Sequence, residues 1–300
     1  MFIAASPYLS LLRPKQWIKN LFVLIPAMFV FKKMEAGGAL ALSLTLAAFC
    51  LFSSAVYIMN DLRDAESDRL HMRKRRRPIA SGEVTPKRAR ALCASLLLAA
   101  LSLSAAAGLA PASIGAAYVL LNVAYSFRLK SIPIIDVFCI ALGFVLRVYA
   151  GGAAIGFLPS PWLMLNTFFL SLFLGFGKRR GELLAAASPA ESVRPVLGEY
   201  RPEMLNFFLL TSCSMTLVCY AVYTIDAPTV SSIGSSDLVY TVPVAAYGVF
   251  RYTFTLFRQG EREDADIAEA VLSDGALLLA VGLWLLMTFA IVLRGGLFTL

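Results

Sequence analysis

Acidic and basic side chains gather in the segment NDLRDAESDRLHMRKRRRPIASG, residues 60–82, of a 300-residue chain that is 59% hydrophobic and only 15% charged. Asp61, Asp64 and Asp68 are three and four residues apart, and this spacing places them on one face of a helix. Three carboxylates on one face repel one another, and a hard divalent cation with oxygen ligands relieves the repulsion. Mg²⁺ usually takes one or two carboxylates, keeps several waters and bridges to phosphates. The cluster therefore predicts a site for a metal-bound phosphate or diphosphate.

A solvated helix end is the alternative interpretation of the acidic cluster. Charged runs usually form solvated faces, and the acids have nearby cations with which to pair, namely Arg63, Arg69 and Arg73. The polar Asn60 precedes the acids at the expected membrane edge, and the surrounding chain is sparing with charge. These two observations favour the metal site, with Asn60 supporting the metal or a phosphate oxygen.

Five consecutive cations, from Arg73 to Arg77, follow the acids. Membrane topology and attraction to anionic lipid headgroups explain most of them. One or two can instead donate charge-assisted hydrogen bonds to substrate phosphates, and Pro78 fixes the chain beside Arg77. Lys74 and Arg77 are therefore the candidates for phosphate contacts in this segment.

A second polar group follows in YSFRLKSIPIID, residues 125–136. Tyr125 and Lys130 lie in a polar connection, and Asp136 begins the next apolar run. Arg147 lies farther along that run, where a buried arginine is costly and needs a partner or a watery cavity. Arg147 is therefore a functional candidate, with a structural ion pair between helices as the alternative.

A third polar group is GKRRGE, residues 177–182, at the end of another apolar run. Lys178 and Arg179 are candidates for phosphate contacts. Cations also suit the carboxyl end of a helix, so anchoring is expected for at least two of the three cations there.

The elements that must position these groups are predicted to be membrane helices. The mean hydropathy is +0.73, a balance that no ordinary soluble domain has. The chain holds nine apolar runs, each near the ~20 residues that a helix needs to cross ~30 Å of hydrocarbon. The runs cover about 17–31, 39–60, 91–108, 112–126, 133–156, 161–177, 205–224, 238–257 and 275–293. We therefore expect an all-α integral membrane protein with nine transmembrane helices, and a single polytopic membrane domain over residues 1–300.

Lysine and arginine are distributed very unevenly among the segments that connect these runs. With the amino terminus in the cytoplasm, and with Lys19 at the start of the first run counted there, 22 of the 27 cations lie on the cytoplasmic side, three lie outside and two lie deeper within runs. The positive-inside rule therefore predicts this orientation. Nine spans then place the carboxyl terminus outside, and the polar loops at about 60–90, 126–136 and 178–204 face the cytoplasm. We expect a multi-pass protein of the inner (plasma) membrane whose site uses water-soluble cytoplasmic material.

The supply of histidine and cysteine excludes some other chemistries. The only histidine is His71, which disfavours a multi-histidine metal site or a histidine-dependent triad. The five cysteines are scattered within apolar runs and are interpreted as small buried side chains. The orientation in the membrane accounts for the positive charge, so no nucleic-acid partner is expected. The expected surrounding of the protein is the bilayer. A homo-oligomer is compatible with the sequence.

The acidic segment also resembles a known family. NDLRDAESD fits the pattern NDxxDxxxD, and with RPIASG downstream it resembles the first aspartate-rich motif of the UbiA superfamily of intramembrane prenyltransferases. Nine helices with cytoplasmic polar loops agree with that fold. The resemblance implies Mg²⁺ at Asp61, Asp64 and Asp68. Most members carry a second motif, broadly DxxxD, whereas here Asp136 is followed by VFCI, so the second metal-binding half is missing or reduced to Asp136.

Four other segments resemble one branch of that superfamily, the decaprenyl-phosphate phosphoribosyltransferases. They are LRPKQWIKN at 12–20, YSFRLKSIPIIDV at 125–137, GFVLRVYAGG at 143–152 and GKRRGEL at 177–183. The branch transfers 5-phosphoribose from phosphoribosyl pyrophosphate to a polyprenyl phosphate, which feeds decaprenylphosphoryl arabinose and cell-wall arabinan. The resemblance implies these two substrates, and it implies Lys15, Gln16 and Asn20 as substrate-side polar groups.

Three other functions compete with this interpretation. An aromatic prenyltransferase of the UbiA type, using a polyprenyl diphosphate donor, shares NDxxDxxxD but normally has an intact second motif. A secondary transporter would place its charges near the midplane and often shows an inverted repeat, neither of which is evident here. A structural membrane scaffold does not account for the residues suited to phosphate at one face.

Overall fold

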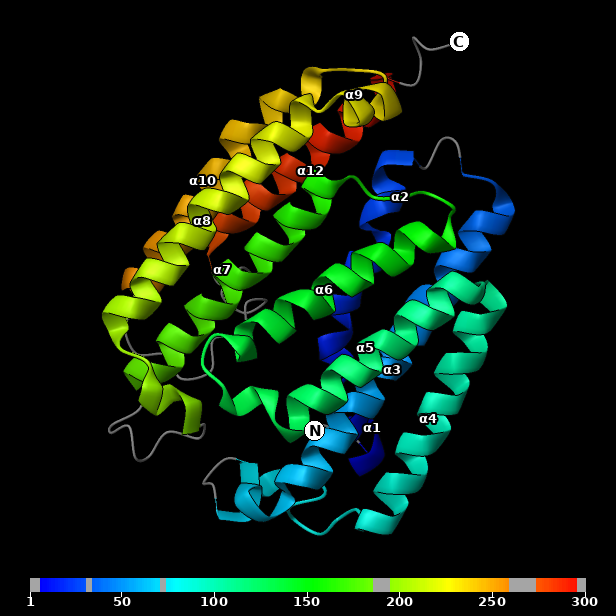
Figure 1. The fold of residues 1–300 in the computed structure, drawn as a ribbon, viewed down its shortest axis with the longest axis vertical. Coiled ribbons are helices and arrows are strands. Elements are labelled where there is room, and N and C mark those ends of the chain that lie inside the picture. The colour runs from blue at the N-terminus through cyan, green and yellow to red at the C-terminus, as the bar shows by residue number, and fades with distance from the viewer. Residues whose placement is uncertain (1–5, 31–33, 71–73, 186–194, 259–273, 296–300) are drawn as a thin grey trace. The chain divides into compact units, whose positions relative to one another are not determined.

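The structure is a computed structural model that describes residues 6–30, 34–70, 74–185, 195–258 and 274–295. All regular elements in these ranges are helical (Figure 1). The chain divides into two compact units, and one of the boundaries between them passes through helix α6, Ile135–Ala154. Unit 1 contains Met1–Ala27, Met34–Leu129 and Leu146–Leu158, and unit 2 contains Met28–Lys33, Lys130–Val145 and Pro159–Leu300. Each unit has its own apolar core.

Unit 1 is organised around the long helix α3, Ala36–Leu70, which packs against α4 and α5 (Figure 1). Its other elements are α1 (Pro7–Leu12), the 3-10 helix η1 (Pro14–Leu24), η3 (Lys74–Arg76), α4 (Pro86–Ala107), α5 (Leu109–Phe127) and the second half of α6. Phe49 and Phe52 of α3 are fully buried in the core, beside Val23 of η1 and Ala150 of α6.

Helix α3 is longer than a membrane crossing requires. Its 35 residues span about 52 Å at 1.5 Å per residue, against about 30 Å of hydrocarbon. The excess carries the acidic motif, because Asp61 to Asp68 occupy its last turns. The prediction that the three aspartates lie on one helix, at the end of an apolar run, is confirmed.

Unit 2 packs α7 against α8, and α10 against both α8 and α12. Its elements are α7 (Pro161–Ala185), η6 (Pro195–Glu199), α8 (Pro202–Ile225), α9 (Ala227–Ile233), η7 (Asp237–Thr241), α10 (Val242–Arg258), α12 (Gly275–Gly295) and the first half of α6. Two short helices, α2 (Ile25–Val30) and η4 (Leu129–Ser131), lie across the boundaries. The core includes Val137 of α6, Phe173 of α7 and Leu205 and Leu209 of α8.

Asp274 joins the last two long helices of unit 2. Its Oδ1 accepts hydrogen bonds from the backbone N–H groups of Ala276 and Leu277, and so caps α12. Its Oδ2 accepts from Nε of Arg251 at 2.8 Å and from the hydroxyl of Thr255 at 2.9 Å, both on α10. These hydrogen bonds lower the pKa of Asp274 to about 2.

Six of the described helices are long and apolar enough to cross a membrane: α3, α4, α5, α6, α8 and α12. The other three predicted runs fall on η1 with α2, on α7 and on α10. The first is split between a 3-10 helix and a six-residue α-helix, α7 ends in the charged KRRGE segment, and α10 has only 17 residues. The all-helical membrane class is confirmed, and the count of nine spans remains a prediction.

Candidate functional site

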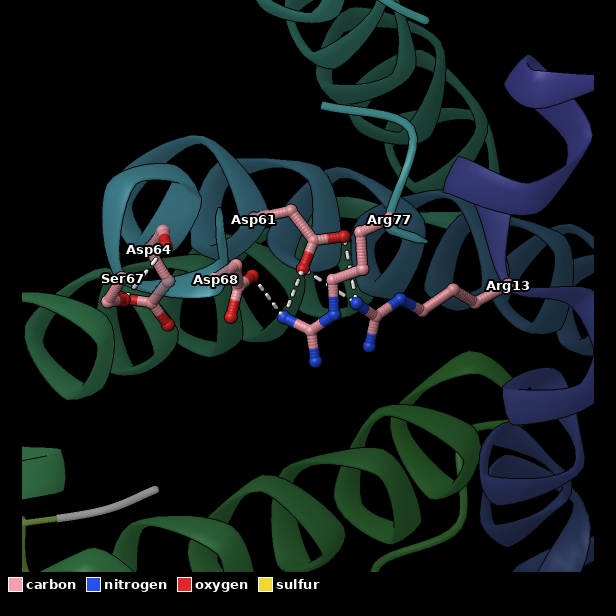
Figure 2. Close-up of polar contacts among 6 residues, drawn as sticks. All are labelled: Arg13, Asp61, Asp64, Ser67, Asp68 and Arg77. Atoms are coloured by element: carbon pink, nitrogen blue, oxygen red, sulfur yellow. Dashed lines mark hydrogen bonds and ion pairs between the residues drawn. The ribbon is translucent and has the colours of Figure 1, made fainter. Parts of the chain in front are cut away.

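Two arginines from separate segments contact the acidic motif at the end of α3 (Figure 2). The NH2 group of Arg13 donates to both carboxylate oxygens of Asp61, at 2.6 and 2.8 Å. Arg77 bridges two carboxylates through its NH1 group, 3.1 Å from Asp61 Oδ1 and 2.7 Å from Asp68 Oδ2. Asp61 and Asp68 are only 3% and 4% exposed. The motif is therefore a nearly buried site in which acidic and basic groups alternate.

The turn between α1 and η1 places Arg13. Arg13 adopts a left-handed backbone conformation, with φ 51° and ψ 58°, which costs a residue other than glycine roughly 1–2 kcal/mol. Its guanidinium lies 4.9 Å from the ring centroid of Tyr57 on α3. The ion pair with Asp61 and the contact with the ring hold this conformation in place. Sequence analysis did not single out Arg13 as a site residue, because its contact with Asp61 joins residues 48 positions apart.

Arg77 is placed by the short loop between η3 and α4. Backbone hydrogen bonds run from Arg77 N–H to Lys74 O and from Ser81 N–H to Arg77 O. Ile79 and Val84 of this loop are buried in a cluster with Ile58 of α3. The apolar contacts hold the loop against α3, so the Arg77 side chain reaches the carboxylates. That Pro78 fixes the chain beside Arg77 stays a prediction.

Asp64 occupies a different position from its two neighbours. Figure 2 shows it apart from both guanidinium groups and beside Ser67, whose hydroxyl donates to the Asp64 backbone carbonyl at 2.9 Å. The nearby cations proposed as alternative partners make other contacts. Arg63 donates to Phe127 O and Arg69 to Ala80 O, while Arg73 lies outside the described residues.

The motif has the donor chemistry of a Mg²⁺ site, since it offers carboxylate oxygens from successive turns of one helix. Among the residues that the structure describes, however, no three carboxylate, imidazole or thiol groups are gathered closely enough to hold a metal ion. The oxygens of Asp61 and Asp68 are paired with arginine instead. The residues fit a divalent cation in their chemistry, and the arginines are the groups that would have to move.

A second polar cluster in unit 1 surrounds Arg147 of α6, which is 6% exposed. Its Nε donates to Asn20 Oδ1 at 2.8 Å and its NH2 to the hydroxyl of Tyr118 at 2.9 Å. The guanidinium also lies 4.7 Å from the Tyr118 ring centroid. Asn20 in turn donates to Ser53 Oγ at 3.1 Å. The structure therefore brings together two predicted substrate groups, Asn20 and Arg147, and adds Tyr118 and Ser53.

Unit 2 has a buried charged cluster of its own, around Asp136. The Nε group of Arg179 on α7 lies 2.6 Å from Asp136 Oδ2, and the two side chains are 1% and 0% exposed. Arg179 also pairs with Glu182 at 2.6 Å. The hydroxyl of Tyr200 donates to Asp136 Oδ1 at 3.0 Å and accepts from the backbone N–H of Ile134. Burial, together with the nearby Asp136 carboxylate, raises the pKa of Tyr200 and keeps its proton available for that hydrogen bond.

Two predicted residues, Asp136 and Arg179, thus meet each other in unit 2. Tyr200 completes the cluster, and the sequence offered no signal for it. The Arg179 guanidinium supplies the counter-charge of the buried Asp136 carboxylate. Arg180, the next residue, ties α7 to α8 and α10 through Asn206 Oδ1 and Leu256 O.

The remaining predicted site residues are spread over both units. Lys15 and Gln16 lie on η1, Asn60 on α3, Lys74 on η3 and Tyr125 near the end of α5, all in unit 1; Lys130 lies on η4 and Lys178 on α7, in unit 2. Lys15 and Lys178 are exposed, and the others are half-buried. Their roles toward a substrate remain predictions.

The helices and the acidic site define a class of protein, an integral membrane protein with a nearly buried acidic and basic site at the end of one long helix. The chain belongs to the UbiA prenyltransferase family, which matches residues 21–270.

Curated relatives agree with this assignment. A decaprenyl-phosphate phosphoribosyltransferase of Mycolicibacterium smegmatis is 34% identical over 259 residues, which are 81% of this chain and 81% of the relative. The protein of that name from Mycobacterium tuberculosis is 32% identical over 279 residues, 89% of each chain. The resemblance to this branch is therefore confirmed.

The fold comparison reaches further. A UbiA homologue from Archaeoglobus fulgidus, solved bound to GPP and Mg²⁺, superposes with a TM-score of 0.73 over 96% of this chain and 99% of the homologue. At 22% identity this similarity concerns the fold, and it confirms the UbiA-like architecture.

Proposed function

We propose that the protein transfers 5-phosphoribose from phosphoribosyl pyrophosphate to a polyprenyl phosphate such as decaprenyl phosphate. The products are polyprenylphosphoryl-5-phosphoribose and pyrophosphate. The first of these is a precursor of decaprenylphosphoryl arabinose, which is used for cell-wall arabinan. One observation carries the proposal: Asp61 and Asp68 form an acidic site, whereas Asp136 is paired with Arg179. A single acidic site of this kind is compatible with a soluble sugar diphosphate as the donor.

Asp61, Asp64 and Asp68 would hold Mg²⁺, with Asn60 beside them on α3. The bound cation supplies positive charge to the departing pyrophosphate. Arg77, together with Lys74 on the neighbouring η3, donates charge-assisted hydrogen bonds to the phosphate oxygens. These groups stabilise negative charge where it develops during the reaction, which is the largest contribution that fixed side chains make.

The bond changes are those of a substitution at C1 of ribose. The C1–O bond to pyrophosphate breaks and its electron pair leaves with pyrophosphate, while an oxygen of the lipid phosphate forms the new bond to C1. A phosphate monoester is largely ionised near neutral pH, since its second pKa is about 6, so the acceptor needs no strong general base. A chain with one histidine can therefore support the reaction.

Arg147 and its neighbours Asn20 and Tyr118 form the group that we assign to the lipid phosphate. The Arg147 guanidinium donates to Asn20 Oδ1 and to the Tyr118 hydroxyl, and its positive charge favours an anion beside it. Lys15, Gln16, Tyr125, Lys130 and Lys178 are further candidates for contacts with one of the two substrates. The polyprenyl tail would enter from the bilayer, and the site would face the cytoplasm at the plasma membrane.

Purified protein incubated with labelled phosphoribosyl pyrophosphate, Mg²⁺ and polyprenyl phosphate tests the proposal. We expect a labelled lipid that forms only when polyprenyl phosphate is present. Asp64→Asn should lose most of this activity at saturating Mg²⁺ while the protein still folds and inserts, because the variant keeps the size of the side chain and removes its charge. Activity of that variant near the wild-type rate would exclude Asp64 from the metal site.

The rival function gives a different result in the same assay. An aromatic prenyltransferase would leave phosphoribosyl pyrophosphate unused and would consume a polyprenyl diphosphate together with an aromatic acid. That outcome would replace the proposed function.

A further inference from the structure

The carboxylates and arginines at the end of α3 differ in their access to solvent. The side chains of Arg13 and Arg77 are 27% and 26% exposed, whereas those of Asp61 and Asp68 are 3% and 5% exposed. A cation arriving from water therefore meets guanidinium groups before it meets carboxylate oxygens. The arginines cover the acidic site on its open side.

The same arginines satisfy the carboxylates. Two hydrogen bonds from Arg13 and two from Arg77 reach Asp61 and Asp68. A nearly buried carboxylate without a counter-charge is strongly disfavoured, so these contacts stabilise the chain without a metal. A divalent cation that takes the same oxygens must separate these pairs and place its two positive charges beside the guanidiniums, which repel it.

A diphosphate changes this balance. Its oxygens accept bidentate hydrogen bonds from arginine at least as well as a carboxylate does, so guanidiniums released from Asp61 and Asp68 gain new partners. It also coordinates the cation directly and offsets the repulsion between cation and arginine.

We propose that Arg13 and Arg77 are exchangeable counter-ions, which make binding of the divalent cation depend on the diphosphate. Metal alone binds weakly because it competes with the arginines; metal and diphosphate together bind strongly because the arginines move from carboxylate to phosphate. By linkage, the metal increases affinity for the diphosphate by the same factor. Arg13 thereby becomes a functional residue. The inference rests on the proposed function in assigning a metal and a diphosphate to this site.

Binding of Mn²⁺ to the purified full-length protein, followed by electron paramagnetic resonance of the free ion, tests the proposal without a transferase assay. Inorganic pyrophosphate is the second ligand, and its own complex with Mn²⁺ is measured in protein-free samples. For the wild type we expect the affinity for Mn²⁺ to rise about tenfold or more when pyrophosphate saturates the site. R13Q and R77Q should bind Mn²⁺ alone several-fold more tightly than wild type, and pyrophosphate should increase their affinity less.

R63Q is the matched control. Arg63 lies on α3 between the same aspartates in sequence, but its guanidinium contacts the backbone carbonyl and the ring of Phe127. The variant removes one positive charge near the site without removing an arginine that contacts Asp61 or Asp68. It should therefore keep the wild-type affinities, and an increase in Mn²⁺ affinity equal to that of R13Q would overturn the proposal.

The wild-type measurement decides the proposal even if R13Q does not fold. Equal Mn²⁺ affinity with and without pyrophosphate would overturn the exchange of counter-ions while leaving a metal site intact. Absence of Mn²⁺ binding under every condition would overturn both the exchange and the metal site of the proposed function. Cooperative binding without phosphoribosyl transfer would support the exchange and reject the proposed substrates.

Discussion

Asp136 illustrates how the role of one residue depends on a partner that is distant in sequence. The carboxylate is fully buried and pairs with Arg179, 43 positions away. Removing one member of a buried ion pair commonly costs about 3–5 kcal/mol, because the other charge stays buried without its partner. We therefore expect Asp136→Asn to lower the unfolding temperature of the purified protein strongly, and Asp136→Asn combined with Arg179→Met to recover part of the loss.

Glu182→Gln is the matched control for this prediction. Glu182 also pairs with Arg179, but its side chain is 17% exposed, so its removal should cost clearly less than that of Asp136. Thermal unfolding in one detergent compares all the variants. If Asp136→Asn unfolded at the wild-type temperature and yet lost all transfer activity, Asp136 would be a substrate or metal group instead of a structural one.

At the scale of elements, η1 and α6 approach each other closely at Gly151. A Cβ atom at this position would overlap the backbone carbonyl oxygen of Val23. Because the obstacle is backbone, no side-chain rotation relieves it, and overpacking of this kind costs about 1–3 kcal/mol or more. We expect Gly151→Ala to destabilise unit 1 and, by shifting η1, to weaken the contact of Asn20 with Arg147.

Gly282 of α12 provides the comparison. A Cβ atom there meets nothing within 4 Å, so Gly282→Ala should leave stability unchanged or raise it by about 0.5–1 kcal/mol through its helix propensity. Thermal unfolding measures both variants. Equal unfolding temperatures for the two would contradict the close approach at Gly151.

Local patterns predicted the elements better than they predicted the contacts between them. Asp61 and Asp68 lie on α3 and Arg77 lies in the loop between η3 and α4, so spacing and charge were sufficient to single them out as candidates. Their roles toward a metal or a substrate remain predictions. Arg13 and Tyr200 contact the aspartates only because distant segments pack together, and neither leaves a periodic signal in the sequence. The span count depends on whole-segment hydropathy, which is ambiguous for η1 with α2, for α7 and for α10.

The side of the membrane on which each terminus lies is a property of the whole molecule, because it depends on the total number of crossings. An odd number of crossings separates the termini, whereas an even number places them on the same side. Of the 27 lysines and arginines, 22 fall in segments assigned to the cytoplasm, and such an asymmetry normally sets the orientation. Nine crossings therefore predict an amino terminus in the cytoplasm and a carboxyl terminus outside.

Reporters fused to each terminus test this prediction in intact cells. A fluorescent protein that folds in the cytoplasm should be bright at the amino terminus, and alkaline phosphatase, active only after export, should be active at the carboxyl terminus. A fluorescent reporter inserted after Glu83, in the loop before α4, is the internal reference, because the acidic site and this loop are predicted to face the cytoplasm. Both termini in the cytoplasm would mean an even number of crossings, and one or all three of the ambiguous elements would then not span the bilayer. A reference reporter found outside would show that the orientation of the whole chain is the reverse of the predicted one. The acidic site would then face away from a cytoplasmic sugar diphosphate.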